Sequence, residues 1–197
     1  EYLQCGAEAT KGVLLTFDDA RRNFYDVTFP LLQEYNMRAT LFVPTYWMRD
    51  GVSQCENMEG DGKELFMTWE QLRECASSGF VDVQSHAHRH ALVYTSDKLV
   101  GFVTPENLAA YDIYDWPMQS VKGENKLGCP LLGTPIYEAE PLLSASMRLI
   151  EDEDVVLACQ EEVRRNGGAE FFARSDWTEQ LHAVHDRVRG RKQASMN

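Results

Sequence analysis

Hydrophobic positions in the first half of the chain fall into short continuous runs separated by helical stripes. Residues 12–17 and 39–43 are nearly continuous apolar runs, the pattern of strands buried on both faces of a parallel sheet. Between them, residues 24–36 carry apolar side chains at helical spacing, with Pro30 tolerated near the start of the helix. A strand, a helix and a second strand in this order predict a βαβ unit and a parallel sheet.

A second helix and a third strand follow. Thr68 and Gln71 form the signature of a capping box, which predicts a helix over residues 69–78 that ends at Gly79. The alternating run over residues 80–85 then predicts a third strand. Three strands alternating with helices before residue 90 indicate an α/β fold.

The hydrophobic pattern is weaker after residue 90. Thr104 followed by Pro105 predicts the start of a helix that runs to about residue 114. An acidic run opens a further helix over residues 151–165, where the carboxylates suit the helix dipole, and Ser175 caps a last helix. We expect the basic segment 187–192 at its end to be a frayed tail.

Strand signals in the second half are faint. Residues 100–103 and 134–137 are two short candidates. Residues 117–135 hold Pro and Gly in irregular order, which is typical of a long loop. The sequence therefore predicts three clear strands, all of them in the first half.

Composition and charge narrow the class of protein. The 197 residues, 44% of them hydrophobic, are sufficient for one domain, which we expect to span residues 1–197. The net charge of −12 argues against nucleic acid or an anionic membrane surface as a partner, because both bind basic patches. The chain contains no run of about 18 apolar residues, so we expect no membrane span. The sequence from Glu1 onward has no signal-peptide pattern, which a mature or trimmed chain would also lack.

The five cysteines are widely spaced and contain no Cys-x-x-Cys pair, which argues against a cysteine zinc site. Cys75 lies within a predicted helix, where we expect a small buried hydrophobic side chain. Cys55 and Cys129 lie in predicted loops and are candidates for a disulfide.

Two polar clusters stand at predicted strand ends, where core packing does not explain them. Asp18 and Asp19 end the first strand, and His86, His88 and His90 follow the third. In parallel α/β folds these carboxyl ends of strands are where sites are built. Adjacent carboxylates repel each other, which usually indicates a cation or a shared proton. The alternatives are solvated turns or, for the aspartates, a helix N-cap.

The spacing of these residues suits a metal ion. His86 and His90 are four residues apart, which places two imidazoles on one side of a helical turn. With one carboxylate from Asp18 or Asp19, they form a set of two histidines and one aspartate that suits zinc or a similar divalent ion. Three protein ligands leave positions open for water and substrate.

These residues resemble a known family. Thr16-Phe17-Asp18-Asp19 resembles the first motif of the polysaccharide deacetylases, the NodB-homology enzymes of carbohydrate esterase family four. The run from Ser85 to His90 resembles the second motif, with His86 and His90 as its two histidines. The elements between the motifs also follow the order of the family, and the resemblance covers residues 12–92.

The resemblance implies a fold, a reaction and residue roles. The fold is a distorted (β/α) barrel of the NodB-homology type, and the reaction is metal-dependent hydrolysis of acetyl groups on an N-acetylated or O-acetylated polysaccharide or oligosaccharide. The resemblance implies Asp18 as the catalytic base and Asp19, His86 and His90 as ligands of a divalent ion, zinc in the first place and cobalt or another ion otherwise. It also implies an extracellular or cell-envelope location.

The chain departs from the family pattern at several positions. Ala87 stands where the family has Ser or Thr to order the histidine loop, and no convincing third motif with its Arg is found. The segment 112–116 resembles the Asp-x-x-Asp-Trp motif but follows the histidines too closely, so we interpret it as a helix end. His182 and His185 are candidates for a general acid, but they flank the apolar stripe of the last helix, and we expect both to be solvated.

The barrel of the family has about seven strands, and the sequence predicts three clear ones. We therefore expect an incomplete barrel, with a motif-bearing half over residues 12–92 and a truncated C-terminal part over residues 93–197. An exposed sheet edge in such a barrel predicts self-association.

Two other functions fit the same residues. His86-Ala87-His88 also matches the His-x-His pair of amidohydrolase-type metal hydrolases, although that pair usually lies on the first barrel strand. A catalytically idle carbohydrate-binding or scaffold domain would keep both motifs and lack the general acid.

Overall fold

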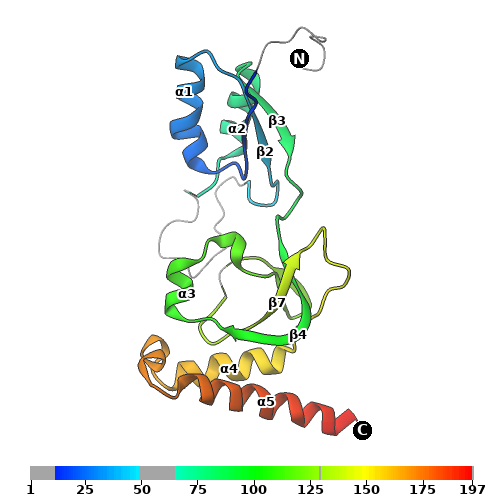
Figure 1. Cartoon of the computed structure of the whole chain (residues 1–197). Helices are drawn as coiled ribbons and strands as arrows, with labels where there is room; N and C mark the ends of the chain where they lie inside the picture. Colours follow the sequence, from blue (N-terminus) through cyan, green and yellow to red (C-terminus); the bar gives the residue numbers. More distant parts are fainter. Residues whose placement is uncertain (1–11, 49–64, 129, 197) are drawn as a thin grey trace. The chain divides into compact units, whose positions relative to one another are not determined.

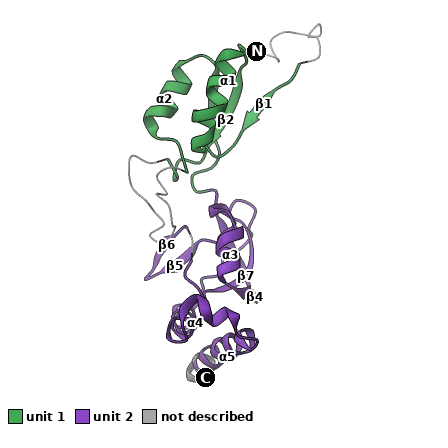
Figure 2. Ribbon diagram, turned by 90° about the vertical axis from the view of Figure 1, so that its left-hand side faces the viewer, with its two compact units in different colours: residues 1–53, 60–89 green, residues 54–59, 90–197 purple. Residues whose placement is uncertain are grey.

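The computed structural model describes residues 12–48, 65–128 and 130–196 (Figure 1). They form a mixed α/β chain that divides into two compact units (Figure 2), and the division falls inside the histidine loop. Unit 1 holds the described residues up to Arg89, and unit 2 holds those from His90 onward. Within this part of the chain, no helix combines the length and the hydrophobicity that crossing a bilayer requires.

Unit 1 is built on a three-stranded parallel sheet with the order β1-β2-β3. The strands β1 (Leu15–Phe17), β2 (Ala39–Val43) and β3 (Val81–Ser85) pair in register. The predicted βαβ unit and the third strand are therefore confirmed. Because the strands are parallel, their carboxyl ends lie at one edge of the sheet, and both polar clusters begin there.

The first strand is shorter and more exposed than predicted. Val13 is 88% exposed and Leu14 is 78% exposed, and only Leu15–Phe17 pair with β2. β1 is an edge strand among the described residues, so no neighbouring strand covers its outer side. The prediction of a strand over residues 12–17 is wrong for its first residues, and the prediction of burial on both faces is wrong throughout, since Leu15 and Phe17 are half-buried and Thr16 is exposed.

The helix predicted between β1 and β2 forms in two parts. A π-helix, η3 (Phe24–Thr28), leads directly into α1 (Phe29–Glu34). The Phe29 N–H donates to the Phe24 carbonyl five residues back, so the wide turn moves the inward-facing position from i+3 to i+5. Phe24 and Phe29 are accordingly buried, whereas Val27, three residues after Phe24 on the apolar stripe of a regular α-helix, is exposed.

The second predicted helix of unit 1, α2 (Trp69–Ser77), is confirmed with its capping box. Thr68 Oγ1 accepts a hydrogen bond from the Gln71 N–H (3.2 Å), and the Thr68 N–H donates to Gln71 Oε1 (2.9 Å). The chain leaves the helix through Gly79, whose φ of +78° few other residues adopt. Cys75 is fully buried in this helix, as predicted.

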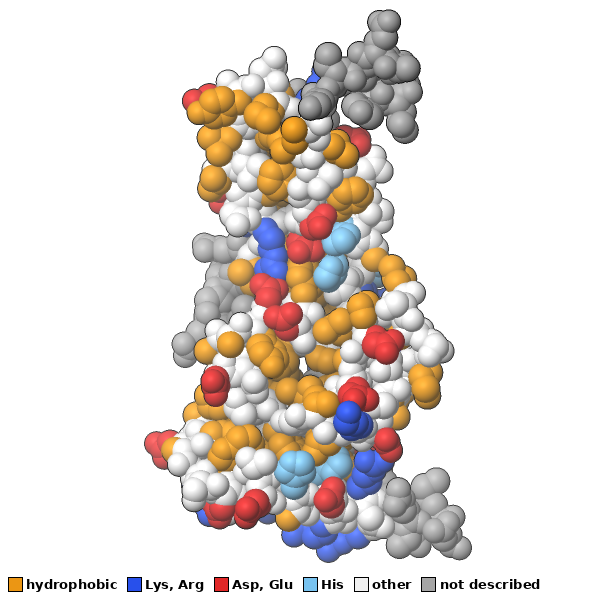
Figure 3. Space-filling view, viewed as in Figure 1, with side chains coloured by type: hydrophobic (Ala, Val, Ile, Leu, Met, Phe, Trp, Pro, Cys, Tyr) orange, Lys and Arg blue, Asp and Glu red, His pale blue; other side chains and the backbone are white. Residues whose placement is uncertain are grey.

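The core of unit 1 lies between the sheet and these helices. Its buried hydrophobic residues include Phe24, Phe29, Leu32, Leu41, Val43, Met48, Met67 and Leu72. Hydrophobic side chains also gather at the surface of unit 1 on the face shown in Figure 3. Val13, Leu14, Val27 and Leu31 are exposed in this unit.

Unit 2 is organised around an antiparallel strand pair that the sequence predicted only in fragments. β4 (Leu92–Phe102) pairs with β7 (Pro135–Pro141), and two register shifts interrupt the pairing. Irregularities of this kind break the strict alternation of hydrophobic and polar residues. The pattern therefore showed only residues 100–103 and 134–137.

A hairpin lies within the segment 117–135, which was predicted to be a loop. β5 (Gln119–Val121) pairs with β6 (Glu124–Lys126) across a two-residue turn. Lys122 and Gly123 both have positive φ, +52° and +79°, as a type I′ turn requires. Lys-Gly is a weaker turn signal than Asn-Gly, and the loop prediction is wrong here.

All three helices predicted for the second half are present. α3 (Pro105–Ala110) begins with the Thr104 cap but ends earlier than predicted, and α4 (Glu153–Arg165) begins at Asp152. α5 (Trp177–Met196) continues through the basic segment, so the predicted frayed tail is wrong. With the short helix η6 (Gly168–Ala173), these elements bury Phe102, Val155, Cys159, Val163, Phe171, Leu181 and Val184.

Several predictions about the architecture are not decided by the described residues. They contain one parallel sheet and two separate antiparallel pairs, and these strands do not close into a barrel. The incomplete barrel and the single domain therefore stay predictions. The candidate disulfide between Cys55 and Cys129 lies outside the described residues.

Candidate metal centre

The chain turns sharply after β1, at the two predicted aspartates. Asp19 and Ala20 have φ values of +74° and +46°, a region that residues other than Gly rarely adopt. Ala20 is fully buried, and its carbonyl accepts a hydrogen bond from the Met67 N–H (2.9 Å). Such strain costs about 1–3 kcal/mol and persists only where the surroundings fix it. The packing of Ala20 therefore fixes Asp18 and Asp19 against the end of β1.

The histidine loop, residues 86–90, contains the same kind of backbone strain. Ala87 and His90 have φ values of +61° and +47°. The His86 N–H donates to the Val43 carbonyl (3.0 Å), which extends the pairing of β2 and β3 into the loop. Four of the six non-glycine residues with positive φ in the described part of the chain lie in the aspartate turn and this loop. Strain concentrated in this way is typical of functional sites.

The two turns bring three of the predicted site residues together. Asp19 Oδ1 and His86 Nε2 are 3.6 Å apart. One ligand atom from each of Asp19, His86 and His90 lies within 4.8 Å of the other two. Ligands at about 2.0–2.1 Å from a tetrahedral zinc ion are about 3.4 Å apart, so the Asp19–His86 spacing suits a shared ion.

The donor atoms of this cluster also fit a divalent metal. One carboxylate oxygen and two imidazole nitrogens form a set that zinc binds, and it leaves further positions open. Asp19 and His86 are half-buried and His90 is exposed, so solvent and substrate have access. Asp18 is exposed and precedes Asp19 directly, which allows its carboxylate to contact water beside the cluster.

The third histidine of the loop makes different contacts. His88 Nδ1 hydrogen-bonds to Thr45 Oγ1 (2.9 Å), and its ring lies edge-on to Tyr46 with centroids 5.7 Å apart. The Tyr46 N–H donates to the His88 carbonyl, and Trp47 Nε1–H donates to the Arg89 carbonyl, both at 2.8 Å. Thr45, Tyr46 and Trp47 were not predicted from the sequence, although they directly follow β2, whose carboxyl end lies beside that of β3.

The segment that resembles the Asp-x-x-Asp-Trp motif has a local structural role. Asp115 Oδ2 accepts a hydrogen bond from the Asp112 N–H (2.7 Å), and Asp112 Oδ1 accepts one from the Tyr114 N–H (3.2 Å). The two carboxylates thus cap a short helix, η5 (Ile113–Asp115). Asp112 therefore begins a separate short helix after α3, so the interpretation of this segment as the end of the preceding helix is wrong.

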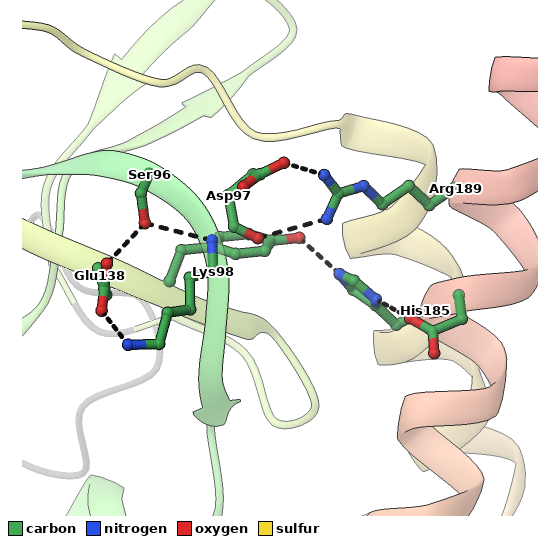
Figure 4. A network of polar contacts seen from close by, with 8 residues as sticks. Ser96, Asp97, Lys98, Glu138, His185 and Arg189 are labelled. Carbon is green, nitrogen blue, oxygen red and sulfur yellow. Dashed lines mark hydrogen bonds and ion pairs between the residues drawn. The ribbon is translucent and has the colours of Figure 1, made fainter.

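The two candidate acids on α5 differ from each other. His182 is exposed, as predicted, but His185 is only 3% exposed, so the prediction that it is solvated is wrong. In the polar network of Figure 4, His185 Nε2 hydrogen-bonds to the Tyr137 hydroxyl (3.1 Å), and Nδ1 hydrogen-bonds to Asp186 Oδ1 (2.8 Å). Burial raises the pKa of Tyr137 to about 12. His185 therefore joins α5 to β7 inside unit 2.

Curated relatives of the chain are deacetylases by name. Over 79 residues the chain is 38% identical to a poly-beta-1,6-N-acetyl-D-glucosamine N-deacetylase of Escherichia coli, a match that covers 39% of this chain and 12% of that protein. Over 113 residues it is 26% identical to the enzyme of the same name from Staphylococcus epidermidis, which covers 57% of this chain and 36% of the relative. The chain thus spans only about an eighth to a third of these relatives.

Solved structures that resemble the chain include two deacetylases. The deacetylase domain of BpsB from Bordetella bronchiseptica is 39% identical, with a TM-score of 0.36 over 42% of this chain and 33% of that one. A de-N-acetylase from Aggregatibacter actinomycetemcomitans is 28% identical, with a TM-score of 0.42 over 49% of this chain and 38% of that one.

The family match covers the part of the chain that holds the strained turns. Residues 6–111, more than half of the chain, match the family described as Polysaccharide deacetylase. This range contains Asp18, Asp19, His86 and His90. The chain therefore belongs to the polysaccharide deacetylase family.

Proposed function

We propose that the chain is a metal-dependent hydrolase that removes acetyl groups from an acetylated amino-sugar polymer. The observation that carries the proposal is the convergence of Asp19, His86 and His90 at the carboxyl edge of the parallel sheet. The relatives are named for poly-β-1,6-N-acetylglucosamine, so we propose an N-acetylated polymer of this kind as the substrate. O-acetylated polymers are the second class to test. Such polymers would place the activity at the cell envelope or outside the cell.

In this proposal Asp19, His86 and His90 hold a divalent ion, with zinc preferred and cobalt or another ion as alternatives. A divalent ion bound there supplies Lewis-acid chemistry, since it makes a water more acidic and polarises an acetyl carbonyl. The strained turn and the half-buried positions of Asp19 and His86 support this role, because they fix both side chains before the ion binds.

Asp18 is the proposed catalytic base. It directly precedes the ligand Asp19 and is exposed, so its carboxylate can accept the proton of the water that attacks the acetyl carbonyl. A backbone N–H beside the site would stabilise the negative charge that develops on the carbonyl oxygen. Attack by water breaks the bond between the acetyl carbon and the sugar nitrogen, and it releases acetate and the amine.

The contacts of His88 favour this function over a His-x-His metal hydrolase. That alternative needs His86 and His88 as a ligand pair, but the cluster in the described residues contains His86 with His90. His88 Nδ1 hydrogen-bonds to Thr45 instead.

Acetate release tests the proposal directly. The chain is incubated with oligomers of β-1,6-N-acetylglucosamine, with chitooligosaccharides and with a chromogenic acetyl ester, after removal of metal and again after addition of zinc or cobalt. We expect turnover only with metal. Asp18→Asn should abolish turnover and keep metal binding, whereas His86→Ala should lose both.

Two results would contradict the proposal. Metal binding without turnover on any of these substrates would favour the idle carbohydrate-binding domain. Loss of metal binding in His88→Ala, with His90→Ala unaffected, would favour the His-x-His hydrolase.

A further inference from the structure

The segment that follows β2 contacts the histidine loop through several hydrogen bonds and a cation–π contact. The Tyr46 N–H and the Trp47 side-chain Nε1–H each donate a 2.8 Å hydrogen bond to a backbone carbonyl of the loop, and Thr45 Oγ1 hydrogen-bonds to His88 Nδ1. The Arg89 guanidinium also lies over the Tyr46 ring, 5.8 Å from its centroid. Each of these contacts lies within unit 1.

The loop needs support from outside because the side chain of residue 87 cannot stabilise it with a hydrogen bond. Ala87 has a φ of +61° and no polar side-chain atom, so it adds backbone strain and makes no side-chain hydrogen bond. A strained conformation persists only when its surroundings determine it. Thr45 and His88 join the segment after β2 to this loop by a hydrogen bond between their side chains.

We propose that Thr45 and His88 are positioning residues for the metal centre. Their hydrogen bond fixes the loop between His86 and His90, and thereby sets the position of the His86 imidazole 3.6 Å from Asp19. His88, a strong ligand by residue type, thus acts through the loop and not on the metal. This inference rests on the proposed function, because it concerns the affinity of the same site for its ion.

Because Thr45 and His88 are exposed, an effect on metal affinity can be distinguished from an effect on folding stability. Both Thr45 and His88 are exposed, so loss of their hydrogen bond should have little effect on the stability of the metal-free chain. It should instead release the loop, and the ion must then order that loop when it binds. We expect about fivefold weaker binding, which corresponds to about 1 kcal/mol for one hydrogen bond at about 1.4 kcal/mol per tenfold.

The test measures the affinity of the whole chain for Co²⁺ and Zn²⁺, by competition with a chromophoric chelator, together with the visible spectrum of the Co²⁺ form. Thr45→Val removes the hydroxyl at nearly constant volume, and Thr45→Ser restores it. His88→Phe removes the ring nitrogens and keeps an aromatic edge against Tyr46. The matched control is His182→Phe, because exposed His182 makes a similar edge-on contact with Phe102, with centroids 5.3 Å apart.

The expected result is weaker binding and an altered Co²⁺ spectrum in Thr45→Val and His88→Phe, with near-normal behaviour in Thr45→Ser and His182→Phe. The double variant Thr45→Val, His88→Phe should lose no more affinity than either single variant, because both remove the same bond. The thermal midpoint of the metal-free chain should not change.

The outcomes separate this inference from the proposed function. Wild-type affinity and spectrum in Thr45→Val and His88→Phe would overturn the positioning role and leave the proposed function intact. Equal losses in Thr45→Val and Thr45→Ser would also overturn it, since the hydroxyl would then not matter. A wild-type chain that binds neither ion would remove the proposed function, and the positioning role with it.

Discussion

The two units of the chain, coloured separately in Figure 2, differ in where their functional and buried polar side chains lie. In unit 1, Asp18, Asp19, His86 and His88 are half-buried or exposed at the end of the parallel strands. The three buried polar or charged side chains among the described residues, Thr134, Glu151 and His185, all lie in unit 2.

This difference in burial distinguishes polar groups that can bind an ion or a substrate from polar groups that stabilise the fold. A site needs ligands that an ion and a substrate can reach, and it concentrates strain where the geometry must be fixed. A buried polar group must instead be hydrogen-bonded inside the protein, because its desolvation is otherwise uncompensated. A histidine from each unit should therefore fail in a different assay when it is replaced.

The largest effect is expected for His86→Ala. Loss of one of three ligands should weaken zinc binding by more than about 100-fold, because loss of groups behind the ligands already costs about 10- to 100-fold. The metal-free chain should unfold at nearly the wild-type urea concentration, since His86 is half-buried and outside the core. Isothermal titration calorimetry and urea unfolding measure the two quantities.

His182→Ala, an exposed histidine of unit 2, is the control and should change neither quantity. If His86→Ala lowers stability and leaves zinc affinity unchanged, the histidine loop is a structural feature, and the contrast between the units disappears.

The next effect compares two glycines with similar positive φ values. A Cβ at Gly133 in unit 2 (φ +84°) would lie 2.7 Å from Val163 Cγ2 and 2.9 Å from the Cys159 carbonyl oxygen. A Cβ at Gly79 in unit 1 (φ +78°) would have no atom within 4 Å. We expect Gly133→Ala to cost about 2–4 kcal/mol, from overpacking added to backbone strain. Gly79→Ala should cost only about 1–2 kcal/mol.

Urea unfolding of both variants measures the difference. Gly101→Ala is the control, because its Cβ would meet nothing within 4 Å and its φ is not positive. Equal losses at Gly133 and Gly79 would show that backbone strain alone decides, and that the packing around Gly133 can relax.

A smaller effect is expected at the buried histidine of unit 2. His185→Leu keeps most of the volume but leaves the Tyr137 hydroxyl without its ring-nitrogen partner, so it should cost about 1–3 kcal/mol of unfolding free energy. Zinc affinity should stay at the wild-type value, in contrast to His86→Ala.

Tyr137→Phe, His185→Leu tests the cause, since removal of both partners should restore part of the loss. If the double variant instead loses as much unfolding free energy as the two single variants together, the hydrogen bond contributes nothing, and His185 stabilises unit 2 by packing alone.

The contrast also explains how much of the molecule the sequence could predict. In unit 1 the capping box at Thr68, the run 39–43 and both polar clusters are local patterns, and the structure forms each of them. The π-helix over Phe24–Thr28 was not predictable from a 3.6-residue period, because it shifts the phase of the helix that follows.

In unit 2 the determining interactions join residues far apart in the chain. β4 and β7 pair through register shifts that no local alternation reveals, and His185 is buried by its contact with Tyr137, 48 positions away. The role of Thr45 was hidden for the same reason, since its partner His88 lies beyond another helix and strand. Residue types and spacing indicated the ligands, but only the folded chain shows which groups hold them.

The smallest effect concerns the buried carboxylate of unit 2. Glu151 is 7% exposed, and its Oε1 accepts a hydrogen bond from the Ser120 N–H, whereas Oε2 has no hydrogen-bond partner among the described residues. Burial raises the pKa of Glu151 above its ordinary 4.5, although backbone hydrogen bonds and the charge of Arg148 oppose the rise. The prediction that the whole acidic run over residues 151–154 stabilises the helix dipole is therefore wrong at its first residue.

The raised pKa fixes the sign of the pH dependence. Because the folded chain binds this proton more tightly than the unfolded chain, the contribution to stability is present below about pH 4.5 and is lost as the pH rises through the folded-state pKa. Glu151→Gln keeps the acceptor for Ser120 and carries no charge, so it should match or exceed wild-type stability at pH 7 by less than about 1 kcal/mol. Its advantage should shrink at about pH 4.

Glu153→Gln is the matched control in the first turn of α4, where loss of a favourable charge should lower stability at pH 7 by about 0.3–1 kcal/mol. Urea unfolding at both pH values would reveal opposite signs for the two neighbouring glutamates. Losses of the same sign would instead place the Glu151 charge among the stabilising ones, and unit 2 would then gain from a buried carboxylate.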